Sequence, residues 1–344
     1  MKMYSFKSDY CEGAHPQVIE ALVRTNLEQT TGYSQDEYCD QARLKIKAQL
    51  KRDDVDIHFL VGGTQANLIV IASALKPYQA CIAADTGHIN VHETGAVEAT
   101  GHKVLTIPSD DGKITCSQVQ QILNEHSDEH MVQPKMIYIS NPTEVGTIYS
   151  ADELKALYAF AKENNLYLFV DGARLASALA ITENSMTLED LAYYSDVFYI
   201  GGTKCGALFG EAVVIVNESL KPDFRYMMKQ RGGMLAKGRL LGLQFLTLFE
   251  NNLYFQIGEY ENRMAARMRD VFIQHGLTFL ADSPSNQLFP ILKDSVIEAI
   301  GEKYEYTYMQ RIDPYHSCIR LVTSFATNAK KVEEFIIDME NLLK

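Results

Sequence analysis

The chain has 344 residues, 47% of them apolar, which is enough to bury a large core and to form two domains. Its net charge of −12 at pH 7 argues against nucleic acid or an anionic membrane as a partner, because such surfaces attract basic proteins. The six cysteines are dispersed, the first residues are polar, and no apolar run approaches the ~20 residues that span a bilayer. These features predict a cytoplasmic protein with reduced thiols and no metal site.

The first two thirds of the chain alternate short apolar runs with helical segments. Helices are expected at 15–29 and 36–51. Seven β-rich runs follow, at 57–61, 80–84, 103–107, 135–140, 166–170, 197–200 and 212–216. Helical segments such as 64–75, 117–126 and 151–164 separate them. Several runs are almost continuously apolar, as in strands covered on both faces, so the pattern predicts an α/β fold with a mostly parallel sheet.

The pattern changes after residue 238. Two long helices are expected at 240–251 and 257–275. A β-rich stretch and a closing helix follow, at 278–280, 287–292, 304–311, 317–323 and 329–343. We therefore expect a large domain over residues 1–245, which includes the N-terminal segment, and a smaller α+β domain over residues 246–344.

Unusual polar and glycine residues follow the ends of the predicted strands. Gly62-Gly63-Thr64 follows the first strand, and Asn141-Pro142-Thr143 follows the fourth. Asp171 and Arg174 follow the fifth strand, and Thr203-Lys204 follows the sixth. Ligands of open α/β sheets bind outside the carboxyl ends of the strands, so these residues are expected to share one site.

Lys204 lies in a turn of small residues after an apolar strand. Partial burial lowers the pKa of an amine and leaves it nucleophilic, which suits a lysine that forms a Schiff base. Asp171 suits the ring-nitrogen partner of pyridoxal phosphate, since that cofactor is expected to meet a lysine and a carboxylate. The ordinary alternatives are a lysine at the edge of the core and an aspartate that caps a helix. The pair predicts a pyridoxal-phosphate enzyme.

Gly62-Gly63-Thr64 is the candidate phosphate site. A glycine-rich turn before a helix presents free N–H groups and the positive end of the helix dipole. The turn is neither G-x-G-x-x-G nor a Walker sequence, which argues against dinucleotides and nucleoside triphosphates. A tight connection is the plain alternative. Beside Lys204 and Asp171, the phosphate site is the preferred interpretation, and Thr203 offers a hydroxyl to the same phosphate.

Further candidates are histidines and arginines. His88 follows the second strand, where a structural histidine is the default; beside a pyridoxal ring it would stack on the ring or move a substrate proton, a task also open to His92 and Glu93. Arg174 and Arg320 suit a substrate carboxylate, because the planar guanidinium binds it through two hydrogen bonds. Each arginine, taken singly, is more often a surface or ion-pair residue.

Motifs along almost the whole chain resemble those of the threonine aldolase and β-eliminating lyase family, within the aspartate-aminotransferase superfamily of pyridoxal-phosphate enzymes. Their order and spacing make the resemblance specific. They are Lys7-Ser8-Asp9, Gly32-Tyr33, Gly63-Thr64 with Asn67, His88-Ile89 with Glu93 and Gly95-Ala96, Asp171-Gly172-Ala173-Arg174, Thr203-Lys204-Cys205-Gly206, Gly232-Gly233-Met234 and Ile319-Arg320-Leu321-Val322-Thr323. The resemblance implies a large domain with a seven-stranded sheet, a small C-terminal domain, and a homodimer or homotetramer with shared active sites.

The resemblance also implies roles for single residues. Lys204 resembles the lysine that carries the cofactor, Asp171 the partner of the ring nitrogen, and His88 the residue stacked on the ring. The implied phosphate contacts are Gly63, Thr64 and Thr203, and Arg174 is also expected to contact the cofactor. The implied substrate contacts are Ser8, Arg174 and Arg320 for the carboxylate, and Tyr33, which reaches the site across the dimer.

Two positions depart from the family pattern. The usual Glu-Asn-Thr-His-Asn after the fourth strand is replaced by Ser140-Asn141-Pro142-Thr143-Glu144, so the histidine used near the substrate hydroxyl is missing. Gly87 is inserted before His88 and shifts the residue expected to stack on the ring.

The expected activity is cleavage of a β-hydroxy-α-amino acid, of the threonine or allo-threonine type, to glycine and an aldehyde. In this hypothesis His88, or Glu93 through a water molecule, takes the proton of the β-hydroxyl group. The alternative with the same cofactor is a β-eliminating lyase or an aminotransferase acting on another amino acid. The alternative from another class is a catalytically idle scaffold or a protein that binds sugar nucleotides.

Overall fold

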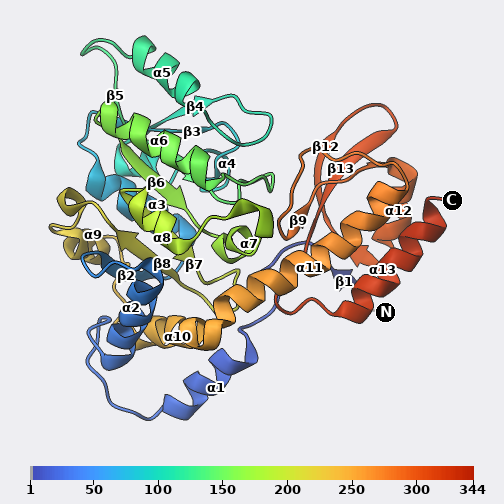
Figure 1. Ribbon diagram of the computed structural model, residues 1–344, viewed down its shortest axis with the longest axis horizontal. Helices are drawn as coiled ribbons and strands as arrows, with labels where there is room; N and C mark the ends of the chain where they lie inside the picture. Colours follow the sequence, from blue (N-terminus) through green and yellow to red (C-terminus); the bar gives the residue numbers. More distant parts are fainter. Residues whose placement is uncertain (1–2) are drawn as a thin grey trace.

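The computed structural model describes residues 3–344, apart from the side chain of Glu183. A seven-stranded sheet dominates it, with the strand order β2-β8-β7-β6-β5-β3-β4 (Figure 1). β3, β4, β5, β6 and β7 run parallel, and β8 is antiparallel to both of its neighbours. The strands are β2 (Asp56–Leu60), β3 (Gln79–Ala84), β4 (Lys103–Ile107), β5 (Gln133–Ser140), β6 (Tyr167–Asp171), β7 (Val197–Gly201) and β8 (Glu211–Ile215). The mostly parallel seven-stranded sheet predicted from the sequence is confirmed.

The sheet is covered on both faces, which explains the continuous apolar runs. Successive residues of β3 point to opposite sides: Ile82 packs in one hydrophobic cluster, while Cys81 and Ala83 pack in the other. The first cluster contains residues of α2 (Glu37–Leu50), α5 (Cys116–Glu125), α6 (Ala151–Glu163), α7 (Leu175–Leu179), α8 (Leu188–Tyr193) and α10 (Arg239–Phe249). The second contains residues of α3 (Gly63–Ala74) and α9 (Phe224–Gln230). The sheet is therefore the middle layer of three.

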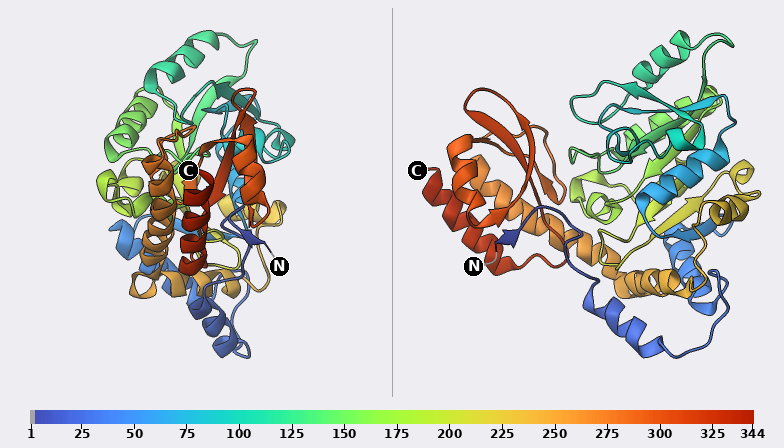
Figure 2. Two further views of the ribbon diagram at one scale, coloured as in Figure 1. Left: turned by 90° about the vertical axis from the view of Figure 1, so that its right-hand side faces the viewer. Right: turned by 180° about the vertical axis from the view of Figure 1, so that it is seen from behind.

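A third hydrophobic cluster lies beside these layers, and the 22-residue helix α11 (Leu253–Gln274) connects it to them (Figure 2). Ile257 of α11 packs in the cluster under the large sheet, whereas Met264 and Met268 pack in the third cluster. The other elements here are β9 (Gln287–Leu288), β10 (Ile291–Lys293), α12 (Asp294–Gly301), β11 (Tyr304–Glu305), β12 (Thr307–Arg311), β13 (His316–Val322) and α13 (Ala329–Leu342). The expected strand at 278–280 is only an isolated bridge between Phe279 and Pro290.

The N-terminal segment passes between the two parts of the molecule. β1 (Tyr4–Ser5) pairs with β11, and Phe6 packs in the third cluster, next to Phe335 of α13. α1 (Pro16–Thr25) and α2 then lead to the large sheet. The division of the chain at residues 245 and 246 stays a prediction. The remaining short elements are α4 (His88–Val91), η1 (Glu98–Thr100), η2 (Thr182–Asn184), η3 (Glu218–Leu220) and η4 (Glu250–Asn252). Within residues 3–344, no helix has the length and apolar character needed to cross a membrane.

Gly258 sets the approach of α11 to α7, the short helix that follows the Asp171 motif. A Cβ atom built on Gly258 would overlap the backbone carbonyl of Ala176. We expect Gly258→Ala to lower the free energy of unfolding by about 1–3 kcal/mol, because two packed helix backbones must move apart. Urea unfolding measures the change. Gly13→Ala is the matched control, since its Cβ would lie 3.9 Å from the nearest atom, a Leu208 methyl group. Equal urea midpoints for both variants would contradict this account of Gly258.

Candidate active site

A cavity of about 750 Å³ lies at the carboxyl ends of β2, β5, β6 and β7. It receives side chains from both parts of the molecule, because Met309 of β12 and Arg320 of β13 complete its wall. The sequence-predicted residues that line it are Gly63, Thr64, His88, His92, Asp171, Arg174, Thr203, Lys204 and Arg320. Three other sequence-predicted residues, Ser8, Tyr33 and Glu93, are outside this lining.

One end of the cavity is the N-terminus of α3. The cap residue Gly62 makes no side-chain hydrogen bond, and the helix bonds begin with the N–H of Ala66 donating to the Gly62 carbonyl (3.0 Å). The N–H groups of the first turn are therefore available to an anion, and the helix dipole favours negative charge there. A Cβ on Gly63 would lie 3.0 Å from the Tyr199 hydroxyl, so a larger residue would crowd the turn. This end fits a phosphate group.

Lys204 follows β7 in a tight turn. The N–H groups of Gly202 and Thr203 both donate to the Gly210 carbonyl (2.9 and 3.1 Å), which holds the turn against the start of β8. Burial lowers the pKa of Lys204, and the positive charge of Arg174 lowers it further. A lysine with a lowered pKa exposes a neutral, nucleophilic amine at neutral pH more often than a surface lysine does.

Asp171 is a buried carboxylate that is held by neutral donors. Its Oδ2 accepts hydrogen bonds from the Tyr138 hydroxyl (2.5 Å) and the Asn67 amide (3.2 Å), and its Oδ1 accepts one from the Ala173 N–H (2.9 Å). Burial, and after it the charge of Asp171, raise the pKa of Tyr138 well above its ordinary value, so the tyrosine is a donor. Asp171 has no ion-pair partner among residues 3–344. A cationic ring nitrogen in the cavity would supply one.

Glu93 lies behind His88 and away from the cavity. Its Oε1 accepts hydrogen bonds from His88 Nδ1 (2.8 Å) and from the Asn67 amide (2.7 Å), and its side chain is fully buried. Glu93 therefore fixes Nδ1 of His88 as the protonated nitrogen and leaves Nε2 free. His92 stands at the cavity mouth, with its ring centre 5.4 Å from that of His88. Burial, with a smaller effect of His88, lowers the pKa of His92.

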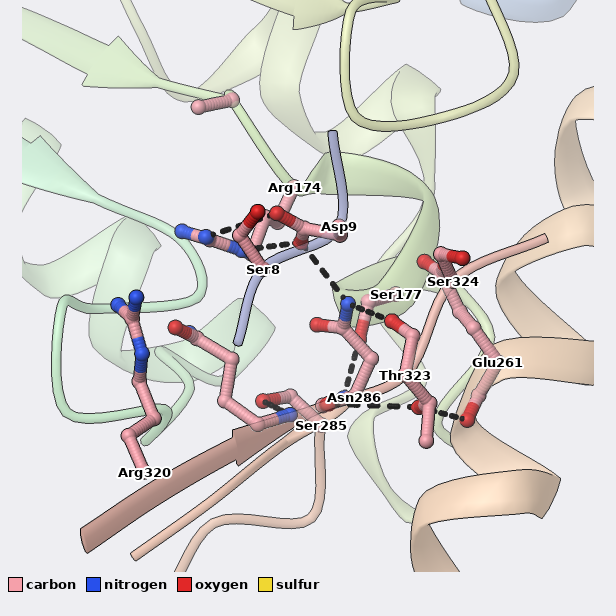
Figure 3. A network of polar contacts seen from close by, with 12 residues as sticks. Ser8, Asp9, Arg174, Ser177, Glu261, Ser285, Asn286, Arg320, Thr323 and Ser324 are labelled. Atoms are coloured by element: carbon pink, nitrogen blue, oxygen red, sulfur yellow. Dashed lines mark hydrogen bonds and ion pairs between the residues drawn. The ribbon is translucent and has the colours of Figure 1, made fainter. Parts of the chain in front are cut away.

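Arg174 forms a buried ion pair with Asp9 (Figure 3). Its Nε donates to Asp9 Oδ2 (2.6 Å) and its Nη2 donates to Oδ1 (3.0 Å), while Asn286 donates to Oδ2 (3.0 Å). Burial alone would raise the pKa of Asp9, but the charges of Arg174 and Lys204 and the hydrogen bonds from Arg174 and Asn286 together outweigh this effect, and the pKa is lowered. One edge of the guanidinium is thus occupied, and the edge formed by Nη1 and Nη2 remains for a ligand.

Arg320 lies on the same side of this network as Arg174 (Figure 3). Its Nη2 donates to the Lys7 carbonyl (3.5 Å), and its buried Nε has no hydrogen-bond partner in the described part of the chain. Burial lowers the pKa of Arg320, and the charge of Arg174 adds to this effect. Two guanidinium groups and a single carboxylate, that of Asp9 paired with Arg174, leave an excess of positive charge. This wall fits a carboxylate ligand.

Ser8 and Tyr33 are placed differently. The Ser8 hydroxyl lies beside Arg174 in Figure 3, but its hydrogen-bond contact is Cys11 Sγ (3.2 Å). Tyr33 is 43% exposed, and Lys229 Nζ lies 4.7 Å from the centre of its ring. Within one copy of the chain, Tyr33 is a surface residue, so a role in this cavity would require a second copy.

Three carboxyl groups that line the cavity, Asp85, Glu144 and Glu211, were not among the sequence-predicted site residues. Glu144 follows β5, and Glu211 begins β8. Glu211 accepts hydrogen bonds from the Thr203 hydroxyl (2.8 Å) and the Gly202 N–H (3.1 Å), so the Thr203 proton is already engaged. Burial raises the pKa of Glu211 to about 8, although Thr203 and Lys204 oppose the rise. The position of each residue next to the end of a predicted strand was the sequence signal that could have identified it as a site residue.

The raised pKa of Glu211 predicts a pH effect on stability. Between pH 5 and 8 this group is protonated in the folded protein and ionised in the unfolded chain, so its contribution to stability falls as the pH rises. We expect Glu211→Gln to remove this loss of stability with rising pH, because glutamine does not ionise. Relative to the unmodified protein, the variant should gain about 1 kcal/mol or more in free energy of unfolding between pH 5 and 8. Urea midpoints at both pH values measure it, with the exposed Glu129→Gln as control. A difference that stays constant with pH would contradict this role.

Comparisons with known proteins identify the family of the chain. Residues 5–295 match the family described as beta-eliminating lyase. A low specificity L-threonine aldolase of Pseudomonas aeruginosa is 29% identical over 340 residues, which cover 97% of this chain and 96% of the relative. The structure of a Leishmania major threonine aldolase superposes with a TM-score of 0.98 at 46% identity, covering 99% and 100% of the two chains. An aspartate aminotransferase of Thermus thermophilus shares the fold at 13% identity, with a TM-score of 0.72 over 99% and 91% of the chains. The chain belongs to the beta-eliminating lyase family.

Proposed function

We propose that the protein is a pyridoxal-phosphate-dependent aldolase that cleaves a β-hydroxy-α-amino acid, of the threonine or allo-threonine type, into glycine and an aldehyde. The observation that carries this proposal is the set of groups around one cavity: Lys204, the uncompensated carboxylate of Asp171, and the guanidinium groups of Arg174 and Arg320. The L-threonine aldolases among its relatives support the choice of substrate. Nothing in the geometry favours β-elimination or transamination over this reaction.

The described residues fit pyridoxal phosphate both at its phosphate group and at its ring. The first turn of α3, with Gly63 and Thr64, would hold the phosphate, and Asp171 would hold the proton on the ring nitrogen. Lys204 would hold the cofactor covalently, and His88 would lie against its ring. Pyridoxal phosphate, when bound, supplies an electrophilic carbonyl carbon and a ring that withdraws electrons from the substrate Cα.

The protein supplies orientation and proton transfer. Arg174 and Arg320 bind the substrate carboxylate, which fixes the direction of the Cα–Cβ bond in the cavity. A group that accepts the β-hydroxyl proton must face the same cavity. His88 Nε2, His92 and Glu144 meet this condition, whereas the buried carboxylate of Glu93 acts only by holding His88.

The exposed position of Tyr33 supports an assembly of two or four copies with shared active sites. Its ring stands outside the cavity of its own chain, and the cation–π contact with Lys229 orients it at the surface. A neighbouring copy would bring this ring to the second cavity. We place the protein in the cytoplasm, as its charge and dispersed cysteines predict.

The products distinguish the proposed reaction from its alternatives. With L-threonine or L-allo-threonine, the holoenzyme should release glycine and acetaldehyde in equal amounts. Lys204→Ala should abolish nearly all turnover, because the variant lacks the amine that binds the cofactor. Borohydride reduction followed by mass spectrometry should add the mass of the cofactor to the unmodified protein and not to the variant. Release of keto acid and ammonia alone, from any amino acid, would contradict the aldolase.

Arg320 is expected to act mainly in substrate binding. Loss of a charged hydrogen bond is worth about 1.5–3 kcal/mol, so Arg320→Ala should raise KM for L-threonine by roughly tenfold to a hundredfold and change kcat less. Steady-state kinetics measure both constants. Arg311→Ala is the control, because Arg311 is an exposed arginine of the adjoining strand that pairs with Asp294. An unchanged KM for Arg320→Ala would remove this residue from the carboxylate site.

A further inference from the structure

Glu144 stands at the tip of a turn that follows β5. The N–H of Gly146 donates to the Thr143 carbonyl (2.9 Å), and the N–H of Thr143 donates to the Thr147 carbonyl (2.8 Å). Gly146 has a φ of 83°, a left-handed conformation that favours glycine, and a Cβ there would overlap Ser283. The turn is therefore fixed by its own hydrogen bonds and by packing, and Glu144 lines the cavity from a defined position.

The carboxylate of Glu144 is oriented by two donors on the same oxygen. Oε1 accepts hydrogen bonds from the backbone N–H of His88 (2.9 Å) and from the Ser140 hydroxyl (2.7 Å). Oε2 has no side-chain partner within the part of the chain that the structure describes. Glu144 is half-buried, so this second oxygen is available to a ligand in the cavity.

The other acid–base groups of the cavity are less suited to a substrate hydroxyl. Nδ1 of His88 is held by Glu93, and its ring is the one expected against the cofactor. His92 is exposed at the mouth. Both carboxyl oxygens of Glu211 accept hydrogen bonds, from the Thr203 hydroxyl and the Gly202 N–H. Glu144 combines a fixed position with an acceptor oxygen that has no side-chain partner in the described part of the chain.

We propose that Glu144 is a catalytic residue that accepts the β-hydroxyl proton of the substrate, an inference that rests on the aldolase function proposed above. The proton passes from the hydroxyl oxygen to Oε2 of Glu144. The oxygen then forms the second bond to Cβ, the Cα–Cβ bond breaks, and its electron pair stays with Cα. Glu144 gives its proton to water and Cα takes one from water, so that the substrate becomes glycine and an aldehyde without net gain or loss of protons.

The surroundings of Glu144 suit this task. Burial raises the pKa of Glu144 above its ordinary value; the Ser140 hydrogen bond opposes the rise and the charge of Asp171 adds to it. A carboxylate with a raised pKa accepts a proton more readily than a solvated one.

The test distinguishes proton transfer from the β-hydroxyl group from the other functions of the site. Glycine has no β-hydroxyl group, so exchange of its α-hydrogen with D2O reports on the cofactor, Lys204 and the carboxylate site without Glu144. We expect holoenzyme carrying Glu144→Gln to bind pyridoxal phosphate and to exchange glycine hydrogen within about twofold of the unmodified rate. Cleavage of L-threonine should fall by about 10²- to 10⁴-fold in kcat, the usual range for a lost general base.

Controls keep the test decisive. Glu129→Gln removes an exposed carboxylate and should leave both reactions unchanged. Glu144→Asp retains a carboxylate and should recover part of the cleavage rate; it also replaces Glu144→Gln if circular dichroism shows that variant to be unfolded. Cleavage within twofold of the unmodified rate, or an equal loss of glycine exchange and cleavage, would overturn the catalytic role. An unmodified protein that exchanges glycine hydrogen and cleaves no β-hydroxy amino acid would instead overturn the aldolase proposal, and this inference with it.

Discussion

The buried carboxylate of Asp171 is the constraint on which the arrangement of the site depends. Removing a carboxylate from water costs several kcal/mol unless a cation or strong donors compensate it. Here the donors are neutral, and one of them, the Asn67 amide, also donates to Glu93, so a single amide links two buried carboxyl groups. Oε2 of Glu93 and Oδ1 of Asn67 have no partners in the described part of the chain. Positive charge in the cavity would therefore stabilise the buried carboxyl groups of Asp171 and Glu93.

The opposite wall carries the complementary charge. Arg174 and Arg320 stand with Lys204 around the same cavity, and Asp9 neutralises only one of the two guanidinium groups. In the proposed function, an amino acid in the cavity would have its carboxylate toward the arginines and its amino group toward Lys204. The distribution of charge would then orient the substrate before any specific contact with its side chain forms.

The fold and the strand-end residues were predictable because they follow from local patterns. Continuous apolar runs indicate strands covered on both faces, and parallel strands bring their following residues to one edge. The direction in which a side chain points, in contrast, does not follow from the local sequence pattern. Glu93 lies only five residues after His88, yet the turn of α4 places its carboxylate behind the histidine. The Ser8 hydroxyl contacts Cys11, and Tyr33 is exposed at the surface. The spacing of residues in the sequence reveals neither fact. Glu211 is hidden at the start of a buried strand, where an acid is unexpected.

The sheet order determines which residues meet at the cavity. β5, β6 and β7 are neighbours, so Asp171 at the end of β6 lies between the turn that carries Glu144 and the turn that carries Lys204. With strands about 4.8 Å apart, the ends of β5 and β7 that lead into these two turns are separated by roughly 10 Å. In the proposed function, a base beside Cα and a base beside Cβ would thus come from different strand ends. Residues after β5 can therefore differ while the first turn of α3, Asp171 and Lys204 keep their places, and the fold itself is shared with a threonine aldolase and an aspartate aminotransferase.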